Sequence, residues 1–187
     1  MGQARDNNWI PELWALYSIG AVVLLSRIVL RCWVYGFSDL AAEDYVSYLI
    51  PVFYTVSAAG CYLVYTNGHK GDFTQAEINA LTYEETRRVI FGTKWELVLT
   101  YLYPSLLWLF KASMLLLYWR LTRKLERPRL LIRLTAIACL LTYIGVMLTI
   151  SLACMPFRGY WQTSPLRPPN CLRSADIFIA LAVSNIL

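Results

Sequence analysis

The sequence predicts an all-α fold, a polytopic transmembrane helical bundle, and two observations carry this prediction. First, 58% of the 187 residues are hydrophobic and only 16% are charged, with a mean hydropathy of +0.47. A soluble domain of this length needs a more highly charged surface. Second, several long runs contain almost no charge, and a bilayer core about 30 Å thick requires roughly 20 apolar residues of helix. A soluble helical bundle is disfavoured because such runs are rare in water-soluble proteins.

Four apolar runs predict four complete helices, at about 11–33, 44–65, 95–120 and 133–156. The first apolar stretch, 13–30, contains Arg27 near its end and is followed by Arg31 and Cys32 rather than by a small-residue cleavage site, so we expect a retained helix and not a signal peptide. The second and fourth runs contain no charge over 45–65 and 134–157, and the third is interrupted only by Lys111 over 97–119.

A fifth run covers 176–187 and is too short to cross a bilayer, because twelve helical residues reach only about 18 Å. We therefore expect a single transmembrane domain over 1–187 that is C-terminally incomplete, with a partial fifth helix. The alternative is a last segment that only dips into the membrane.

The distribution of basic residues predicts the orientation of the helices. The loop 120–133 contains six basic residues and one acid: Arg120, Arg123, Lys124, Arg127, Arg129 and Arg133, with Glu126. Short basic loops stay in the cytoplasm, which places the N-terminus outside and Arg27 and Arg31 at a cytoplasmic end. We expect a multi-pass protein of the plasma membrane. The lipid bilayer is then the main partner, anionic lipid or a cytoplasmic protein contacts 120–133, and nucleic acid is not a partner.

The cysteines agree with this orientation. Cys154 ends the fourth helix and Cys171 lies in the next outer loop, on the oxidising side, so we expect a disulfide between them, with two free thiols as the alternative. Cys32 is predicted to be reduced, and Cys61 and Cys139 to be thiols buried within helices.

The long outer loop 66–94 is predicted to contain helical turns. Asn67 and Gly68 indicate a turn after the second helix. The pairs Thr74/Glu77 and Thr82/Glu85 have capping-box spacing, so the third helix is expected to begin well before Trp95. Two interpretations stay open: a lid over an outer pocket, or a simple connector.

An enzyme is not expected. Metal-dependent membrane enzymes need several histidines or carboxylates near the membrane boundary, whereas this chain has one histidine, His69. The sequence contains no Walker loop and no paired glycine fingerprint. We therefore expect no metal and no cofactor.

Lys111 is the functional candidate within the membrane, because an ionisable side chain at such depth needs a partner. The expected partner is a carbonyl, a hydroxyl, a water-lined cavity, or a carboxylate on helices that this chain lacks. A purely structural lysine is the alternative. A retinal Schiff base is conceivable for a desolvated lysine, but no other feature of the sequence supports it.

Several motifs, in this order, resemble the fungal rhodopsin-domain integral membrane proteins, a family of seven-helix, receptor-like proteins. They are the stretch "LLSRIVLRCWVYGFSDLAAEDYV", the turn Asn67-Gly68-His69, the stretch "KASMLLLYWRL" from Lys111, and the outer-loop set Cys154, Pro156, Trp161 and Cys171. Two positions depart from the family pattern: Glu43-Asp44 replaces a pair of aspartates, and Asn67 stands where a glycine is usual. The resemblance implies seven helices, and it does not imply retinal on Lys111.

The function predicted from topology and resemblance is that of a receptor-like protein that senses an extracellular ligand. The outer loops would shape ligand access, and Lys111 would link the third helix to the bundle. The cytoplasmic face would present charges: Arg27, Arg31, Glu43, Asp44, Arg120, Arg123 and Lys124. Two alternatives remain: a transporter or channel with Lys111 on an anion path, and a non-functional fragment of a longer receptor-like chain.

Overall fold

The computed structural model describes residues 9–35, 42–73, 75–122, 126–155 and 157–161, although a few side chains at the edges of these ranges are not described. Four long helices form it: α1 (Trp9–Tyr35), α2 (Ala42–Asn67), α4 (Tyr83–Leu121) and α5 (Glu126–Leu152). Three short elements join them: the 3-10 turn η1 (Lys70–Asp72), α3 (Gln75–Ala80) and the 3-10 turn η2 (Phe157–Tyr160). The partial helix expected at 176–187 lies outside the described residues.

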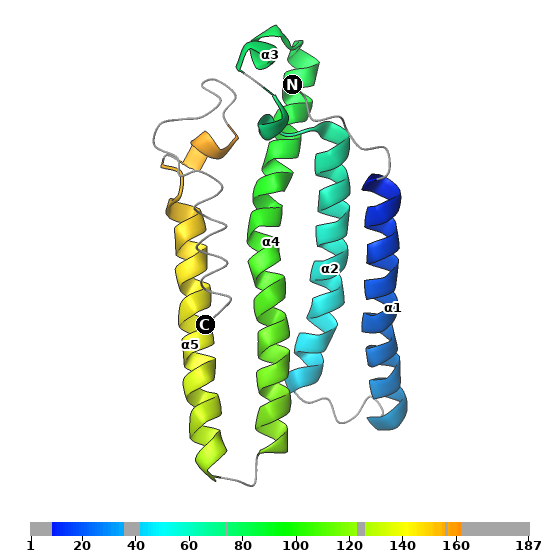
Figure 1. Cartoon of the computed structure of the whole chain (residues 1–187), viewed down its shortest axis with the longest axis vertical. Coiled ribbons are helices and arrows are strands. Elements are labelled where there is room, and N and C mark those ends of the chain that lie inside the picture. Colours follow the sequence, from blue (N-terminus) through cyan, green and yellow to red (C-terminus); the bar gives the residue numbers. More distant parts are fainter. Residues whose placement is uncertain (1–8, 36–41, 74, 123–125, 156, 162–187) are drawn as a thin grey trace.

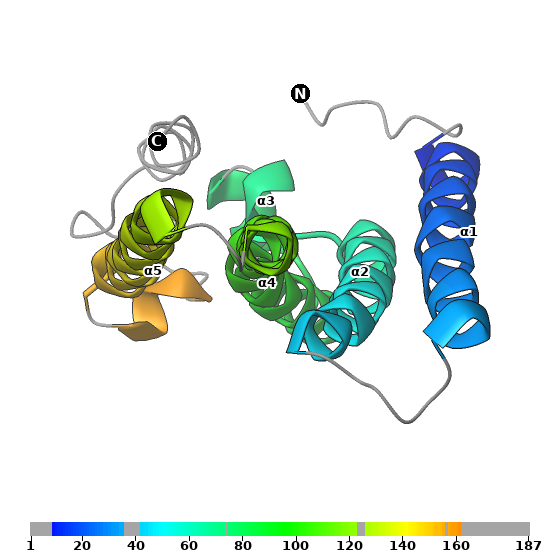
Figure 2. The same ribbon diagram turned by 90° about the horizontal axis from the view of Figure 1, so that it is seen from below.

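The long helices stand side by side in the order α1, α2, α4, α5 (Figure 1). Seen from below, α4 lies between α5 and α2, and α1 lies on the far side of α2 (Figure 2). The contact between α2 and α4 is the largest. We call the end that carries η1, α3 and η2 the loop end, and the opposite end, where α4 ends and α5 begins, the basic end.

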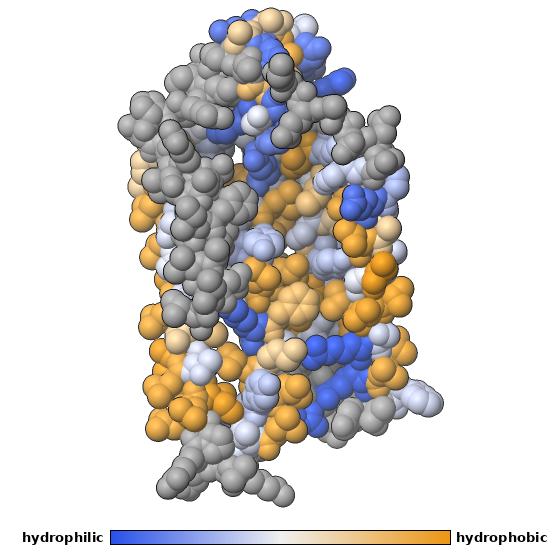
Figure 3. Space-filling view, viewed as in Figure 1, coloured by the Kyte–Doolittle hydropathy of each residue, from blue (hydrophilic) through white to orange (hydrophobic). Residues whose placement is uncertain are grey.

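All four long helices are long and apolar enough to cross a membrane, by length and composition. Their outward faces are apolar, as Figure 3 shows along the flanks of the bundle. Trp33 on α1, for example, is 85% exposed, and Leu131 on α5 is 65% exposed. Lipid can cover such surfaces without cost, whereas water cannot. The prediction of an all-α, polytopic transmembrane bundle is therefore confirmed.

Helix α4 begins earlier than the apolar run that predicted it at 95–120. The backbone N–H of Thr82 donates to Glu85 Oε2 at 2.8 Å, the capping box that the spacing predicted. The helix has 39 residues, so it is about 58 Å long and exceeds a bilayer core of about 30 Å. Its first turns therefore lie beyond the membrane. The Thr74/Glu77 box lies partly outside the described residues, because Thr74 does.

The seam between α4 and α5 combines an apolar cluster with hydrogen bonds. Trp108, Val146 and Ile150 form the buried cluster. Two tyrosine–serine hydroxyl pairs flank it, Tyr101 with Ser151 at 3.0 Å and Ser105 with Tyr143 at 3.1 Å. Lipid tails are as apolar as the side chains, so the hydrophobic effect contributes little to helix association within a membrane. Hydrogen bonds between helices contribute to association there.

Aromatic rings occupy the seam between α1 and α2. Trp9 stacks on Tyr65 with ring centroids 4.6 Å apart, and Tyr17 stacks on Tyr54 at 5.4 Å. The Tyr54 hydroxyl also donates to the Leu16 carbonyl at 3.1 Å. These contacts attach α1 to the rest of the bundle through α2.

Candidate functional site

The turn after α2 approaches α4 very closely because two glycines meet there. Gly68 has a φ of +74°, the left-handed conformation that ends many helices, and its N–H donates to the Val64 carbonyl at 2.9 Å. On α4, a Cβ at Gly92 would overlap the carbonyl oxygen of Gly68. The pair therefore sets how closely the turn can approach α4.

His69 lies between two carboxylates that come from different elements. Its Nδ1 is 3.0 Å from Asp72 Oδ2 in η1, and its Nε2 is 3.8 Å from Glu96 Oε1 in α4. The backbone N–H of His69 also donates to Asp72 Oδ2 at 3.3 Å. A Cβ at Gly71 would lie only 2.8 Å from Nε2, so glycine leaves room for the ring.

Lys70 connects the same turn to α4 and to η2. Its backbone N–H donates to Thr93 Oγ1 at 3.1 Å. Its ammonium donates to the carbonyls of Gly159 at 3.3 Å and Tyr160 at 2.5 Å. Burial lowers the pKa of Lys70, and the carboxylate of Glu96 acts in the opposite direction. We call His69, Lys70, Asp72, Thr93 and Glu96 the loop-end cluster.

Tyr160 extends this connection to α5. Its hydroxyl donates to the carbonyl of Ile150 near the end of that helix. Burial raises the pKa of Tyr160 to about 12, and Tyr101 adds to the shift, so the hydroxyl keeps its proton at physiological pH. The segment after α5 is thus held to both α5 and the loop-end cluster.

Two of the predicted outer-loop residues are described beside this cluster. Trp161 lies under the Lys94 ammonium, 5.7 Å from the ring centroid, and packs edge-on against Phe157. Cys154 is 2% exposed and disulfide-bonded, whereas the other described cysteines are free. Pro156 and Cys171 lie outside the described residues, so the pairing of Cys154 with Cys171 stays a prediction.

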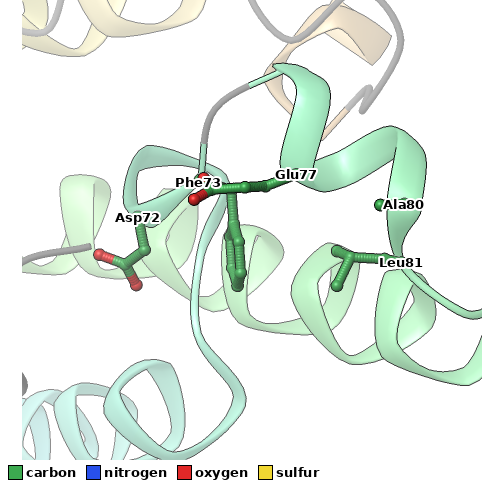
Figure 4. Close-up of a pocket in the computed structure, with 5 residues that line it drawn as sticks. All are labelled: Asp72, Phe73, Glu77, Ala80 and Leu81. Atoms are coloured by element: carbon green, nitrogen blue, oxygen red, sulfur yellow. The ribbon is translucent and has the colours of Figure 1, made fainter. Parts of the chain in front are cut away.

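A pocket of about 340 Å³ opens beside the cluster, between η1 and α3 (Figure 4). Its lining is Asp72, Phe73, Glu77, Ala80 and Leu81. Figure 4 shows Glu77 reaching from α3 towards Phe73, while the ring of Phe73 points into the space below. The pocket thus combines two carboxylates with apolar walls, and it shares Asp72 with the cluster.

Lys111 lies far from this cluster, ten residues before the end of α4. Its ammonium is 4.9 Å from the centroid of the Trp108 ring. Trp108 is 7% exposed, and its Nε1–H donates to the Cys139 carbonyl of α5 at 2.8 Å. An aromatic face attracts a cation. The spacing of three residues on one helix places Trp108 beside Lys111. The sequence did not lead us to expect Trp108 as a partner, because the indole carries no counter-charge.

Arg27 connects α1 to α4. Its Nη2–H donates to Ser113 Oγ at 3.2 Å, and Ser113 is 2% exposed. Arg31, one turn later, is half-buried. The neighbouring Cys32 lies 3.4 Å from the Tyr48 hydroxyl of α2.

The other predicted cytoplasmic charges lie at or near the basic end. Arg120 is exposed in the last turn of α4, and Glu43 and Asp44 belong to the first turn of α2, where their side chains are not described. Arg123 and Lys124 lie outside the described residues.

The structure thus brings Gly68, His69 and Trp161 to the loop end and keeps Lys111 apart from them. Sequence reasoning missed Lys70, Thr93 and the role of Glu96. The polar run "NGHKGD" was the available signal. Within the part of the chain that the structure describes, no group of three or more His, Cys, Asp or Glu side chains is arranged to hold a metal ion.

Comparison with known proteins identifies the family. The model of the fungal rhodopsin domain matches residues 26–187. Searches of curated proteins and of solved structures find no match. The family match covers α2, α4 and α5, the last part of α1 and the whole loop-end cluster. With four membrane-length apolar helices, the chain belongs to the fungal rhodopsin domain family and is a multi-pass membrane protein of that family.

Proposed function

We propose that this protein is receptor-like and senses an extracellular ligand at its loop end, a binding role rather than a catalytic one. One observation carries the proposal: α4 is a single helix that runs from the loop-end cluster to the basic end. It contributes Thr93 and Glu96 to the cluster, Ser113 to the contact with Arg27, and Arg120 to the basic end.

A ligand can act through this helix only if it binds two arrangements of the bundle unequally. Polar contacts hold the turn to α4 through Thr93 and Glu96 and to η2 through Lys70, so a ligand that competes for these contacts changes how α4 is held. Glu96 and Lys70 are the groups it would engage. The proposed orientation places the loop end and the N-terminus outside the plasma membrane and offers the loop 120–133 to a cytoplasmic partner.

The coupling can be tested without knowing the ligand. We would measure hydrogen exchange of residues 116–122 in the full chain, reconstituted in lipid nanodiscs, for the wild type and for Glu96→Gln. We expect Glu96→Gln to change exchange both at the turn 67–72 and at 116–122. Tyr103→Phe is the matched control on the same helix, because Tyr103 is 53% exposed. A change confined to the turn would refute the coupling through α4.

A transporter or channel is the second candidate, and the observation that favours it is a charged side chain, Lys111, within an apolar helix that also contains an internal proline, Pro104. Anion flux into proteoliposomes separates the two. A transporter should show flux that Lys111→Ala abolishes and Lys111→Arg largely retains. The receptor-like proposal predicts no flux above that of protein-free liposomes for any of the three proteins.

A further inference from the structure

We propose that the proton is itself a ligand of the loop end: protonation of His69 draws the turn after α2 onto α4. The inference rests on the proposed function, because it names an input for the same site. His69 is the sole histidine of the chain.

The two ring nitrogens of His69 each lie near a carboxylate. Asp72 Oδ2 lies 3.0 Å from Nδ1. An ionised carboxylate only accepts hydrogen bonds, and a neutral imidazole has a single N–H, so the neutral ring cannot donate to two carboxylates. Only the protonated ring carries a hydrogen on both nitrogens.

Nε2 faces the second carboxylate. Glu96 Oε1 is 3.8 Å away, longer than a hydrogen bond. The protonated ring is a cation with an N–H at Nε2, and a charge-assisted N–H···O bond to Glu96 closes to about 2.8 Å. The glycine at position 71 leaves Nε2 uncovered on its own side, since a Cβ there would lie 2.8 Å from this atom.

Charged groups from two elements surround this contact. Asp72 and Lys70 belong to η1 and Glu96 belongs to α4. Lys94, also on α4, lies over the Trp161 ring. Protonation of the imidazole places a positive charge between the two carboxylates of Asp72 and Glu96. The closed arrangement is therefore stabilised when His69 is protonated and is lost when His69 is neutral.

Shortening the distance between His69 Nε2 and Glu96 Oε1 would affect three elements at once. Lys70, the next residue, donates to Thr93 on α4 and to the carbonyls of η2. A shift of the turn towards α4 therefore also moves η2, which Tyr160 holds to α5. The proton would bias the same contacts that the proposed receptor mechanism uses.

The single histidine makes the test direct. The full chain would carry a histidine-free affinity tag and ¹³C-labelled histidine, and would be reconstituted in nanodiscs. One imidazole signal should then titrate by NMR. We expect Glu96→Gln to lower the pH of half-protonation, because the variant removes the carboxylate that faces Nε2. Glu84→Gln, an exposed carboxylate on the same helix, is the control and should leave the titration unchanged. Equal midpoints for the wild type and Glu96→Gln would overturn the proposal.

A second measurement separates this inference from the proposed function. Hydrogen exchange of the turn 67–72 should slow severalfold between pH 8 and pH 5, after correction for the intrinsic rate, and His69→Gln should abolish the change. If the turn responds but residues 116–122 do not, the proton site stands and the receptor mechanism fails. If Glu96→Gln changes exchange at 116–122 but pH has no effect on the turn, the receptor mechanism stands and the proton site fails.

Discussion

Replacing Gly92 by alanine tests whether the approach of the turn to α4 holds the loop end together. The added Cβ would overlap the carbonyl oxygen of Gly68 and lie 3.0 Å from its carbonyl carbon. Both atoms belong to the backbone, so no rotamer change relieves the overlap. Gly68 is held in turn by its N–H bond to Val64 and by its left-handed conformation. The turn must therefore move away from α4.

The expected cost follows from two opposing effects. Overpacking at a tight contact costs about 1–3 kcal/mol, and this overlap lies at the upper end of that range. Alanine in a helix gains about 1 kcal/mol over glycine. The net loss for Gly92→Ala is then about 2 kcal/mol, which lowers the melting temperature of a protein of this size by about 4–8 °C.

The assay is thermal unfolding of the full chain in nanodiscs, with Gly145→Ala as the matched control. Gly145 lies within α5, and a Cβ there would meet nothing within 4 Å. That variant should unfold at or slightly above the wild-type temperature, because only the helix propensity changes. Equal melting temperatures for the two variants would refute the reasoning, since the propensity gain is common to both.

Three further predictions concern the contacts of the loop end and of α1. Lys70→Met retains the apolar stem but loses both bonds to the η2 carbonyls, so it should destabilise the protein by about 1.5 kcal/mol in the same thermal assay; an unchanged melting temperature would contradict this contact. Ser113→Ala removes the acceptor for Arg27 and should cost about 1 kcal/mol, with faster hydrogen exchange in α1; unchanged exchange would contradict the link. Leu81→Thr creates an Asn-x-Thr glycosylation sequence at Asn79, in a chain that has none, and should produce an endoglycosidase-sensitive mobility shift when the protein is expressed in eukaryotic cells. Absence of the glycan would contradict an external loop end.

The helices could be predicted because their signals are local. A charge-free run long enough to cross a bilayer indicates a spanning helix wherever it packs. The early start of α4 could also be predicted, because Thr82 and Glu85 are three residues apart and form a capping box within one turn. The apolar run predicted a start at 95, which was too late, because helical hydrogen bonding continues beyond the membrane once a cap is available.

The partners of charged groups were harder to predict, and Lys111 shows why. A lysine within an apolar helix is costly, so the sequence predicts a carbonyl, a hydroxyl, a water-lined cavity or a carboxylate as its partner. The ring of Trp108 lies on the same helix, but whether its face meets the ammonium depends on how α5 orients it through the Cys139 carbonyl. The bond from Arg27 to Ser113 likewise joins positions that share no local pattern.

By itself, the sequence determined that this chain crosses a membrane through long helices and which family it resembles, because length, hydropathy and local spacing are properties of contiguous residues. Only the tertiary structure decided which polar groups meet. His69 and Glu96 are far apart in the sequence, and they face each other because Gly68 and Gly92 let α2 and α4 approach without side chains between them. The two helices can approach closely here because glycine has no Cβ. Patterns of charge and hydropathy along the sequence do not show which glycines will face each other.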